Sequence, residues 1–297
     1  MKSIERRLPQ DIDKSFIVFN EVGKCFPYPW HYHPEFELVY VRQSTGRRMV
    51  GDHIGFFDAG DLVFMGKYLP HVWVNDPVYR EEKADHLADA IVVQFTDSFL
   101  GDRFMQIPEV ELFKNTLWLS KRGMAILGNT RKRITRKMDE MLTMNGLQRL
   151  SALLYVFDEL ANTNEYELLA SPAFTQESHF KSSDHFRKIN EYIMNNFHQD
   201  ISLTEIASVA NMAVTTFCNF FKSHYRVTFV EYLNRVKIGH ACKLLSMGEM
   251  NIVEVAYSSG YNNVANFNKQ FRNVKQMTPS EYKKIVSGGY SADTAVT

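Results

Sequence analysis

The sequence has 297 residues, of which 45% are hydrophobic and 23% are charged, and its 34 basic side chains balance its 34 acidic ones. This length accommodates two or three domains, and the composition is typical of a globular protein, which excludes a disordered or fibrous chain. No stretch approaches the roughly 18 uninterrupted apolar residues of a membrane span, and the N-terminus lacks the apolar core of a signal peptide, so neither a membrane partner nor export is predicted.

The distribution of charges and the cysteines indicate a partner and a compartment. Residues 1–100 carry 11 Lys and Arg against 15 Asp and Glu, a balance of −4, whereas residues 184–286 carry 12 against 8, a balance of +4. The C-terminal part therefore has the sign that phosphates attract, although the excess is small. Cys25, Cys218 and Cys242 form no CxxC pair, which predicts free thiols and a cytoplasmic location.

Residues 1–100 are predicted to form short strands separated by turns. The expected strands are "FELVYV", "RRMVG", "DLVFM", "HVWVN" and "AIVVQF", and the expected turns are "STGR", "FDAGD" and "GKYLP". Evenly spaced strands with Gly, Pro and Asp turns are typical of a β-sandwich or a small barrel. We therefore expect a β-domain over residues 1–100.

Residues 101–163 are predicted to be helical. The segment "TRKRITRKMDEMLT" has one strongly charged face. The next segment repeats apolar residues at helical spacing, namely Leu147, Leu150, Leu153, Leu154, Phe157, Leu160 and Ala161. Such helices can pack on the β-domain, pair with a second chain, or do both, and we expect a homodimer. Residues 164–183 have no clear period, which predicts a linker, and residues 287–297 are expected to be a disordered tail.

Residues 184–286 repeat themselves at an offset of about 50 residues. The stretch "EIASVANMAVTTFCNFFK" (205–222) aligns with "EVAYSSGYNNVANFNKQFR" (254–272), and "TFVEYL" aligns with "TPSEYK". The matched landmarks are Glu205 with Glu254, Ala207 with Ala256, Phe217 with Phe267, and Phe221 with Phe271. Each unit is predicted to be a short helix, a tight turn and a longer helix, and a further helix at 229–248 joins the two units.

This repeat predicts a tandem pair of helix-turn-helix motifs. Ala207 and Ala256 supply the small residue where two helices pack, and "ANMA" and "SGYNN" supply the short turns. The inward stripes are expected to hold Phe217, Phe220 and Phe221 in the first unit, and Phe267 and Phe271 in the second. The outward faces hold side chains that can read base edges or bind phosphates: Thr215, Cys218, Asn219, Lys222, Asn263, Asn266, Lys269 and Arg272. A helical bundle with polar outer faces is the alternative, and the paired landmarks favour binding to two successive major grooves of DNA.

The same segment resembles the DNA-binding domain of the AraC/XylS family of bacterial transcription regulators. The resemblance is carried by "ISLTEIASVANMAVTTFCNFFK", "YLNRVKIGHACKLL", "IVEVAYSSGYNNVANFNKQFR" and "TPSEYKK" and covers about a hundred residues. It implies that both recognition helices enter the major groove and that the eight outward residues face DNA. The family often has Gly where these helices end, whereas this sequence has Arg226 and Gln276 there, so we expect the local helix caps to differ.

Two histidines, a glutamate and a later histidine stand out in the N-terminal part. "HYHPEFELVYV" (31–41) and "DAGDLVFMGKYLPHVWVN" resemble the two motifs of the cupin barrel, a double-stranded β-helix. The resemblance implies a metal-ligand set of His31, His33, Glu37 and His71. The same four residues and Trp73 are the candidates for lining an effector pocket. The second motif departs from the family pattern in its spacing from Gly66 to His71 and in having Phe64, and the glycine that closes the first motif is displaced to Gly46.

Three interpretations of this cluster remain open. It can hold a divalent ion such as Zn, Fe, Mn or Ni, it can be a metal-free pocket for a small polar effector, or its histidines can satisfy backbone groups. A carbohydrate is one candidate effector, because aromatic rings that can stack on a sugar lie nearby, at Trp30, Tyr32, Phe36, Tyr40 and Trp73.

The sequence therefore predicts an α+β chain with a cupin-like sensor, helices, a linker and an AraC-type DNA-binding domain. Its expected function is sequence-specific transcription regulation in response to a small molecule, with RNA polymerase as a further candidate partner. The alternative is a cupin metalloenzyme, of the sugar isomerase or oxygenase type, fused to a DNA-binding module. A dimeric adaptor with an inactive pocket is a third possibility. The sequence has no phosphate-binding loop, nucleophile elbow or nucleotide signature, so an enzyme is not expected.

Overall fold

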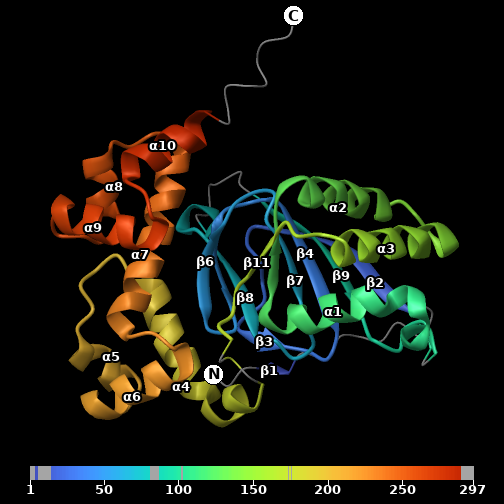
Figure 1. Cartoon of the computed structure of the whole chain (residues 1–297), viewed down its shortest axis with the longest axis horizontal. Helices are drawn as coiled ribbons and strands as arrows, with labels where there is room; N and C mark the ends of the chain where they lie inside the picture. The colour runs from blue at the N-terminus through green and yellow to red at the C-terminus, as the bar shows by residue number, and fades with distance from the viewer. Residues whose placement is uncertain are drawn as a thin grey trace, which may run out of the picture. The chain divides into compact units, whose positions relative to one another are not determined.

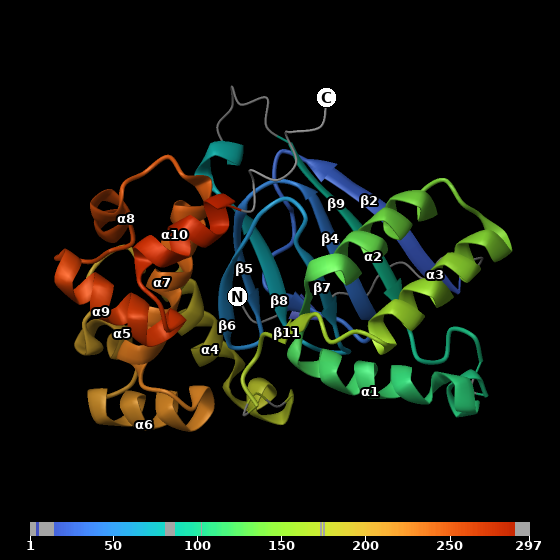
Figure 2. The same cartoon turned by 45° about the horizontal axis from the view of Figure 1, so that its top comes forward.

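A computed structural model describes residues 4–5, 15–80, 87–101, 103–172, 174 and 176–288. Residues 1–53 and 57–184 cluster into one compact unit, and residues 185–297 with 54–56 cluster into a second. We call these unit 1 and unit 2 and describe each by itself (Figures 1 and 2). Most of the predicted tail, from residue 289 on, lies outside the described residues. None of the described helices is long and apolar enough to cross a membrane.

Unit 1 contains two β-sheets. The five-stranded sheet has the order β1-β3-β8-β5-β6 and the six-stranded sheet has the order β11-β10-β7-β4-β9-β2. The strands are β1 (Ile4–Glu5), β2 (Phe16–Gly23), β3 (His31–Tyr32), β4 (Phe36–Gln43), β5 (Gly46–Val50), β6 (His53–Phe57), β7 (Leu62–Met65), β8 (His71–Asn75), β9 (Ala88–Phe95), β10 (Met124–Ile126) and β11 (Tyr166–Leu168). All five strands predicted for residues 1–100 are present.

The six-stranded sheet buries both of its faces, and the alternation of side chains along each strand separates two cores. Leu38 and Ile91 point to a core that includes helical residues. Their neighbours Val39 and Val92 point to a core shared with residues of the five-stranded sheet, such as Trp73. Burial on both faces explains why β4, β7 and β9 are nearly continuous apolar runs in the sequence.

Three helices cover the first of these faces: α1 (Glu111–Leu119), α2 (Gly128–Met141) and α3 (Gly146–Ala161) (Figure 1). Leu153, Phe157 and Leu160 of the predicted apolar stripe lie in the core beneath them. Leu147 at the start of α3 is 82% exposed, and Leu154 is also exposed. The apolar stripe of α3 thus packs mainly on the six-stranded sheet of the same chain. The homodimer remains a prediction. Short 3-10 turns lie at Pro77–Arg80, Phe104–Gln106, Pro108–Val110 and Ser120–Arg122.

One expectation for unit 1 is not confirmed, and another needs correction. The two sheets share no strand among the described residues, so the closed cupin barrel is not confirmed. The expected linker, residues 164–183, contains β11, which pairs with β10, and from Gln176 it is part of helix α4 (Gln176–Asn196). Strand β11 was not predicted because three residues are too few to show a period. Strand β10 is equally short and lies in the segment that was predicted to be helical.

The secondary structure described for residues 185–288 is helical, and the helices after α4 repeat as predicted. They are α5 (Leu203–Val209), α6 (Val214–Tyr225), α7 (Phe229–Met247), α8 (Ile252–Ser258), α9 (Val264–Lys275) and α10 (Pro279–Gly288). Capping boxes, in which a polar side chain and a glutamate cap each other's backbone N–H groups, begin α5 (Ser202 with Glu205), α7 (Thr228 with Glu231) and α8 (Asn251 with Glu254). Thr278 and Glu281 make the same pair of contacts at α10. The matched glutamates of the repeat are therefore helix caps.

The C-terminal ends of α6 and α9 correct one expectation. Arg226 (φ 59°) and Gln276 (φ 58°) both adopt the left-handed conformation that glycine usually supplies at this position. Each backbone N–H bonds to the carbonyl four residues earlier, at Lys222 and Arg272. The cap geometry is therefore kept, and the difference from the family lies only in the residue type, at a cost of about 1 kcal/mol for each non-glycine residue.

Candidate functional site

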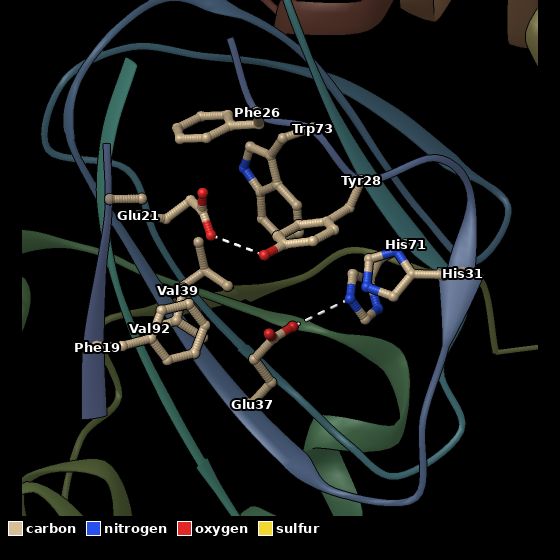
Figure 3. A pocket seen from close by; sticks show the side chains of 11 residues that line it. Phe19, Glu21, Phe26, Tyr28, His31, Glu37, Val39, His71, Trp73 and Val92 are labelled. Atoms are coloured by element: carbon tan, nitrogen blue, oxygen red, sulfur yellow. Dashed lines mark hydrogen bonds and ion pairs between the residues drawn. The ribbon is translucent and has the colours of Figure 1, made fainter. Parts of the chain in front are cut away.

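The pocket of unit 1 lies between its two sheets (Figure 3). The cavity volume, measured for the centre of a water-sized sphere, is about 40 Å³, which leaves room for only a few water-sized groups. The six-stranded sheet and the loop after β2 contribute one part of the lining, with Phe19, Glu21, Phe26, Tyr28, Glu37, Val39, Ala90 and Val92. The five-stranded sheet contributes His31, His71 and Trp73. Strand register brings these residues together, because His31 pairs with His71, Glu21 with Ala90, and Val39 with Val92.

Backbone carbonyls orient the three histidines of the cluster. Nδ1 lies 2.8 Å from the Pro29 carbonyl in His31, 3.2 Å from the Glu35 carbonyl in His33, and 2.7 Å from the Leu69 carbonyl in His71. A carbonyl oxygen can only accept a hydrogen bond, so Nδ1 carries a proton in each ring. In the neutral rings, Nε2 therefore keeps a lone pair.

Glu37 is buried at the centre of this cluster. Its Oε1 accepts a hydrogen bond of 2.7 Å from Gln94 Nε2, and its Oε2 lies 3.0 Å from His71 Nε2 and 3.4 Å from His33 Nε2. Although burial acts in the opposite direction, the charges of His33 and His71 hold the pKa of Glu37 well below its usual value. The carboxyl group is therefore ionised at neutral pH.

The histidines differ in their tendency to be protonated. Burial, reinforced by nearby His71, lowers the pKa of His31 to about 3. Burial also acts to lower the pKa of His33, but the neighbouring Glu37 carboxylate outweighs it, and the net shift is upward. Neutral His31 and ionised Glu37 are the protonation states that a metal ligand requires.

These donors fit a divalent metal ion. One ring nitrogen each from His31, His33 and His71 lies within 4.8 Å of the other two. Nε2 of His33, Nε2 of His71 and Oε2 of Glu37 are buried, and within the described part of the chain they lack a well-formed hydrogen bond. Lone pairs that face one another in this way need a cation among them, either a proton or a metal ion. The backbone contacts at Nδ1 are the kind of support that orients metal-ligating histidines.

In unit 2, the two short helices α5 and α8 each pack on a longer one. Ala207 and Ala256 are almost completely buried at these crossings, as are the inward residues Phe217, Phe221, Phe267 and Phe271. The turns that separate the helices are residues 210–213 and 259–263, which are the predicted "ANMA" and "SGYNN". Phe220 is an exception among the predicted inward residues, since it is only half-buried and its ring lies 4.2 Å from that of His224.

The predicted outward residues lie on the surface of α6 and α9. Thr215, Asn219, Lys222, Asn263, Asn266, Lys269 and Arg272 are exposed, and Cys218 is half-buried. Asn263 also has a structural role, because its Oδ1 accepts a hydrogen bond of 2.8 Å from the Asn266 backbone and caps α9. Each long helix therefore presents one buried aromatic stripe and one exposed polar face, as a recognition helix must.

Comparison with known proteins supports this geometry. Residues 206–285 match the family described as "Helix-turn-helix domain", and this stretch includes both turns and both polar faces. Residues 206–285 therefore form a helix-turn-helix domain of the AraC type.

Similarity to known proteins extends beyond this AraC-type domain. The chain is 22% identical over 263 residues to the HTH-type transcriptional regulator YdeC of Bacillus subtilis, covering 87% of each chain. It is 22% identical over 287 residues to the HTH-type transcriptional activator RhaS of Mannheimia succiniciproducens, covering 94% of this chain and 92% of RhaS. Among solved structures, ToxT of Vibrio cholerae matches 92% of this chain at 14% identity and a TM-score of 0.37.

The pocket contains only part of what the sequence indicated. His31, Glu37, His71 and Trp73 line it, whereas His33 is not among the lining residues and its Nε2 lies 3.4 Å from Glu37 Oε2. Phe36 and Tyr40 pack on the helical side of the six-stranded sheet, because strand alternation turns them away from Glu37 and Val39. Sequence reasoning missed Phe19, Glu21, Phe26, Tyr28 and Gln94. For Gln94, a polar residue inside the apolar run "AIVVQF" was the available signal.

Proposed function

We propose that this chain is a transcription regulator that binds DNA through α6 and α9 and responds to a small polar molecule in the pocket of unit 1. The observation that carries the proposal is the repeat itself: two helix-turn-helix units with matching caps and cores present polar faces on their longer helices. Relatives that cover most of this chain are named transcriptional regulators. An effector acts by binding more tightly to one arrangement of the chain than to another, and it can change the free energy of DNA binding by at most that difference.

We propose that unit 1 is a cupin-like sensor, spanning residues 1–100 together with the strands β10 and β11. Two stacked sheets with a histidine-lined pocket between them support this assignment. The exposed Leu147 and Leu154 of α3 support a homodimer, with RNA polymerase a further candidate partner of the bound complex. A chain that sediments as a monomer at micromolar concentration contradicts the dimer.

A cupin metalloenzyme is the competing proposal. The relatives named as regulators favour sensing over catalysis. Turnover of a sugar or a small acid that is abolished by Glu37→Gln would support the enzyme instead.

DNA binding gives a prediction that separates two kinds of contact. If the exposed Lys222 binds phosphate, Lys222→Ala weakens binding about equally across sequences and lowers the salt slope by about one unit. Asn219→Ala and Lys269→Ala instead change base preference at one position each, by about 1–3 kcal/mol. Fluorescence anisotropy at several salt concentrations, with a set of single-base operator variants, measures both quantities. Unchanged affinity and preference in all three variants would show that DNA contacts another face.

Metal content tests the histidine cluster. His31, His33, His71 and Glu37 would hold the ion, which would offer a Lewis-acid position to an oxygen or nitrogen of the effector. Protein purified without a chelator or a histidine tag is expected to contain about one divalent ion per chain, and the His31→Ala/His33→Ala double variant is expected to lose it. Elemental analysis measures this directly. A metal-free wild-type protein, or equal content in both proteins, contradicts the assignment.

A further inference from the structure

The pocket has a second polar end, formed by Glu21 and Tyr28. The Tyr28 hydroxyl donates a hydrogen bond of 2.7 Å to Glu21 Oε2, and Figure 3 shows this pair across the pocket from Glu37 and His71. Both side chains are half-buried, and both line the pocket. This end is separate from the histidine cluster, and its residues belong to neither of the two cupin-like motifs in the sequence.

An aromatic row connects the two ends. The ring centroids of Tyr28 and His31 are 5.9 Å apart, those of His31 and His71 are 4.3 Å apart, and those of His71 and Trp73 are 5.8 Å apart. Phe19 and Val92 belong to the opposite sheet and lie near Glu37 in Figure 3. The pocket is therefore a slot with one aromatic wall, one largely aliphatic wall and a carboxylate at each end.

The two carboxylates of this slot differ in their partners. Among its described lining residues there are two glutamates and neither a lysine nor an arginine. Glu37 is engaged by Gln94 and the histidines, whereas the described contacts of Glu21 include only the neutral Tyr28 hydroxyl. A carboxylate that lines a partly buried pocket without a cationic partner favours a ligand that brings the cation.

We propose that the effector is a small molecule with a protonated primary amine, which Glu21 and Tyr28 bind at one end of the slot. This inference rests on the proposed sensing function and narrows the effector from any polar molecule to an organic cation. The ammonium N–H groups donate to Glu21 and to the Tyr28 oxygen, whose own proton is already given to Glu21. The aromatic row supports the body of the ligand, and ring faces attract a cation as well.

Other ligand classes fit the slot less well. A carboxylate or phosphate ligand would face Glu21 and Glu37 without a lysine or arginine among the described lining residues. A neutral sugar can stack on Trp73 and bond to Glu21, but it leaves the carboxylate charge unpaired. An alcohol that carries a hydroxyl in place of the amino group therefore shows how much the ligand charge contributes to binding.

Calorimetric titration of the full-length protein tests the proposal with compounds that differ in one group. The probes are 2-phenylethylamine, butylamine and 1,4-diaminobutane, each beside its matched alcohol, together with phenylacetate and glucose. A chelator is present throughout, so that amine coordination to a bound metal is not counted. At least one amine is expected to bind about 10- to 100-fold more tightly than its alcohol, the range typical of a charge-assisted hydrogen bond.

Variants locate the binding site. Glu21→Gln keeps the shape of the side chain and is expected to remove the preference for the amine over the alcohol. Tyr28→Phe is expected to weaken binding of the amine about 10-fold. Glu109→Gln, which removes an exposed carboxylate outside the pocket lining, is expected to change nothing. Circular dichroism confirms that each variant is folded.

Three outcomes overturn the inference: no amine binds, an alcohol, glucose or phenylacetate binds at least as tightly as the amines, or Glu21→Gln binds the amine as wild type does. The proposed sensing function fails differently. An amine that binds through Glu21 but leaves DNA affinity unchanged contradicts sensing and leaves the amine site standing.

Discussion

Gly260→Ala is expected to destabilise unit 2 by about 3 kcal/mol and to abolish specific DNA binding. Gly260 has φ +81° in the turn between α8 and α9, and an added Cβ would lie 2.7 Å from the His198 carbonyl oxygen and within 2.9 Å of two further backbone atoms of His198. The strain cannot be relieved by moving a flexible side chain. The turn is also fixed from α7, because Lys237 Nζ donates a 2.7 Å hydrogen bond to the Gly260 carbonyl and the Tyr261 hydroxyl donates one to Asn234.

Gly248→Ala is the matched control. Gly248 has nearly the same backbone angle, φ +77°, but an added Cβ would meet no atom within 4 Å. This variant is expected to lose only about 1 kcal/mol and to keep DNA binding. Urea denaturation, with amide exchange in α8 and α9 as the local readout, measures both variants. Equal losses in the two would show that backbone conformation alone matters and that the described turn is not tightly packed.

Phe157→Ala is expected to cost about 3–5 kcal/mol of the stability of unit 1. Its ring stacks on Phe113 of α1 at a centroid distance of 4.1 Å and lies 4.8 Å from that of Phe95 in β9. The Phe157 ring therefore joins α1 and α3 to the six-stranded sheet, and the other face of this sheet lines the pocket. The thermal unfolding transition assigned to unit 1 measures the loss.

Leu147→Ala is the control on the same helix. Leu147 is 82% exposed in the single chain, so its replacement is expected to change the stability of the monomer by less than about 0.5 kcal/mol. If Leu147→Ala and Phe157→Ala destabilise the folded chain to the same extent, the described packing of α3 on the sheet is contradicted.

The sequence predicted unit 2 better than unit 1 because the relevant signals are local there. Small residues at helix crossings, short turns and phenylalanines at helical spacing all lie within about 20 residues of one another in each unit. The repeat doubled every signal, so Ala207 and Ala256 supported one another. The left-handed caps at Arg226 and Gln276 could not be predicted, since residue type alone favours glycine there.

In unit 1 the decisive contacts join residues far apart in the sequence. The structure places His31, His33, Glu37 and His71 close together, because strand alternation puts Glu37 on the inner face of β4. Glu21 and Tyr28 reach the same pocket only through the pairing of β2 with β9, which no local pattern reveals. The aromatic residues chosen as sugar platforms were partly wrong, because strand alternation places Phe36 and Tyr40 on the face of β4 opposite Glu37.

The central claim, that one chain places α6 and α9 in two successive major grooves, is tested most directly by hydroxyl-radical footprinting. The DNA is a fragment selected from random or genomic sequences by the full-length protein at moderate ionic strength. For each bound chain we predict two protected segments on the same side of the duplex, with centres about 10 base pairs apart. Protection of a single groove, or no protected site on any DNA offered, would contradict the account.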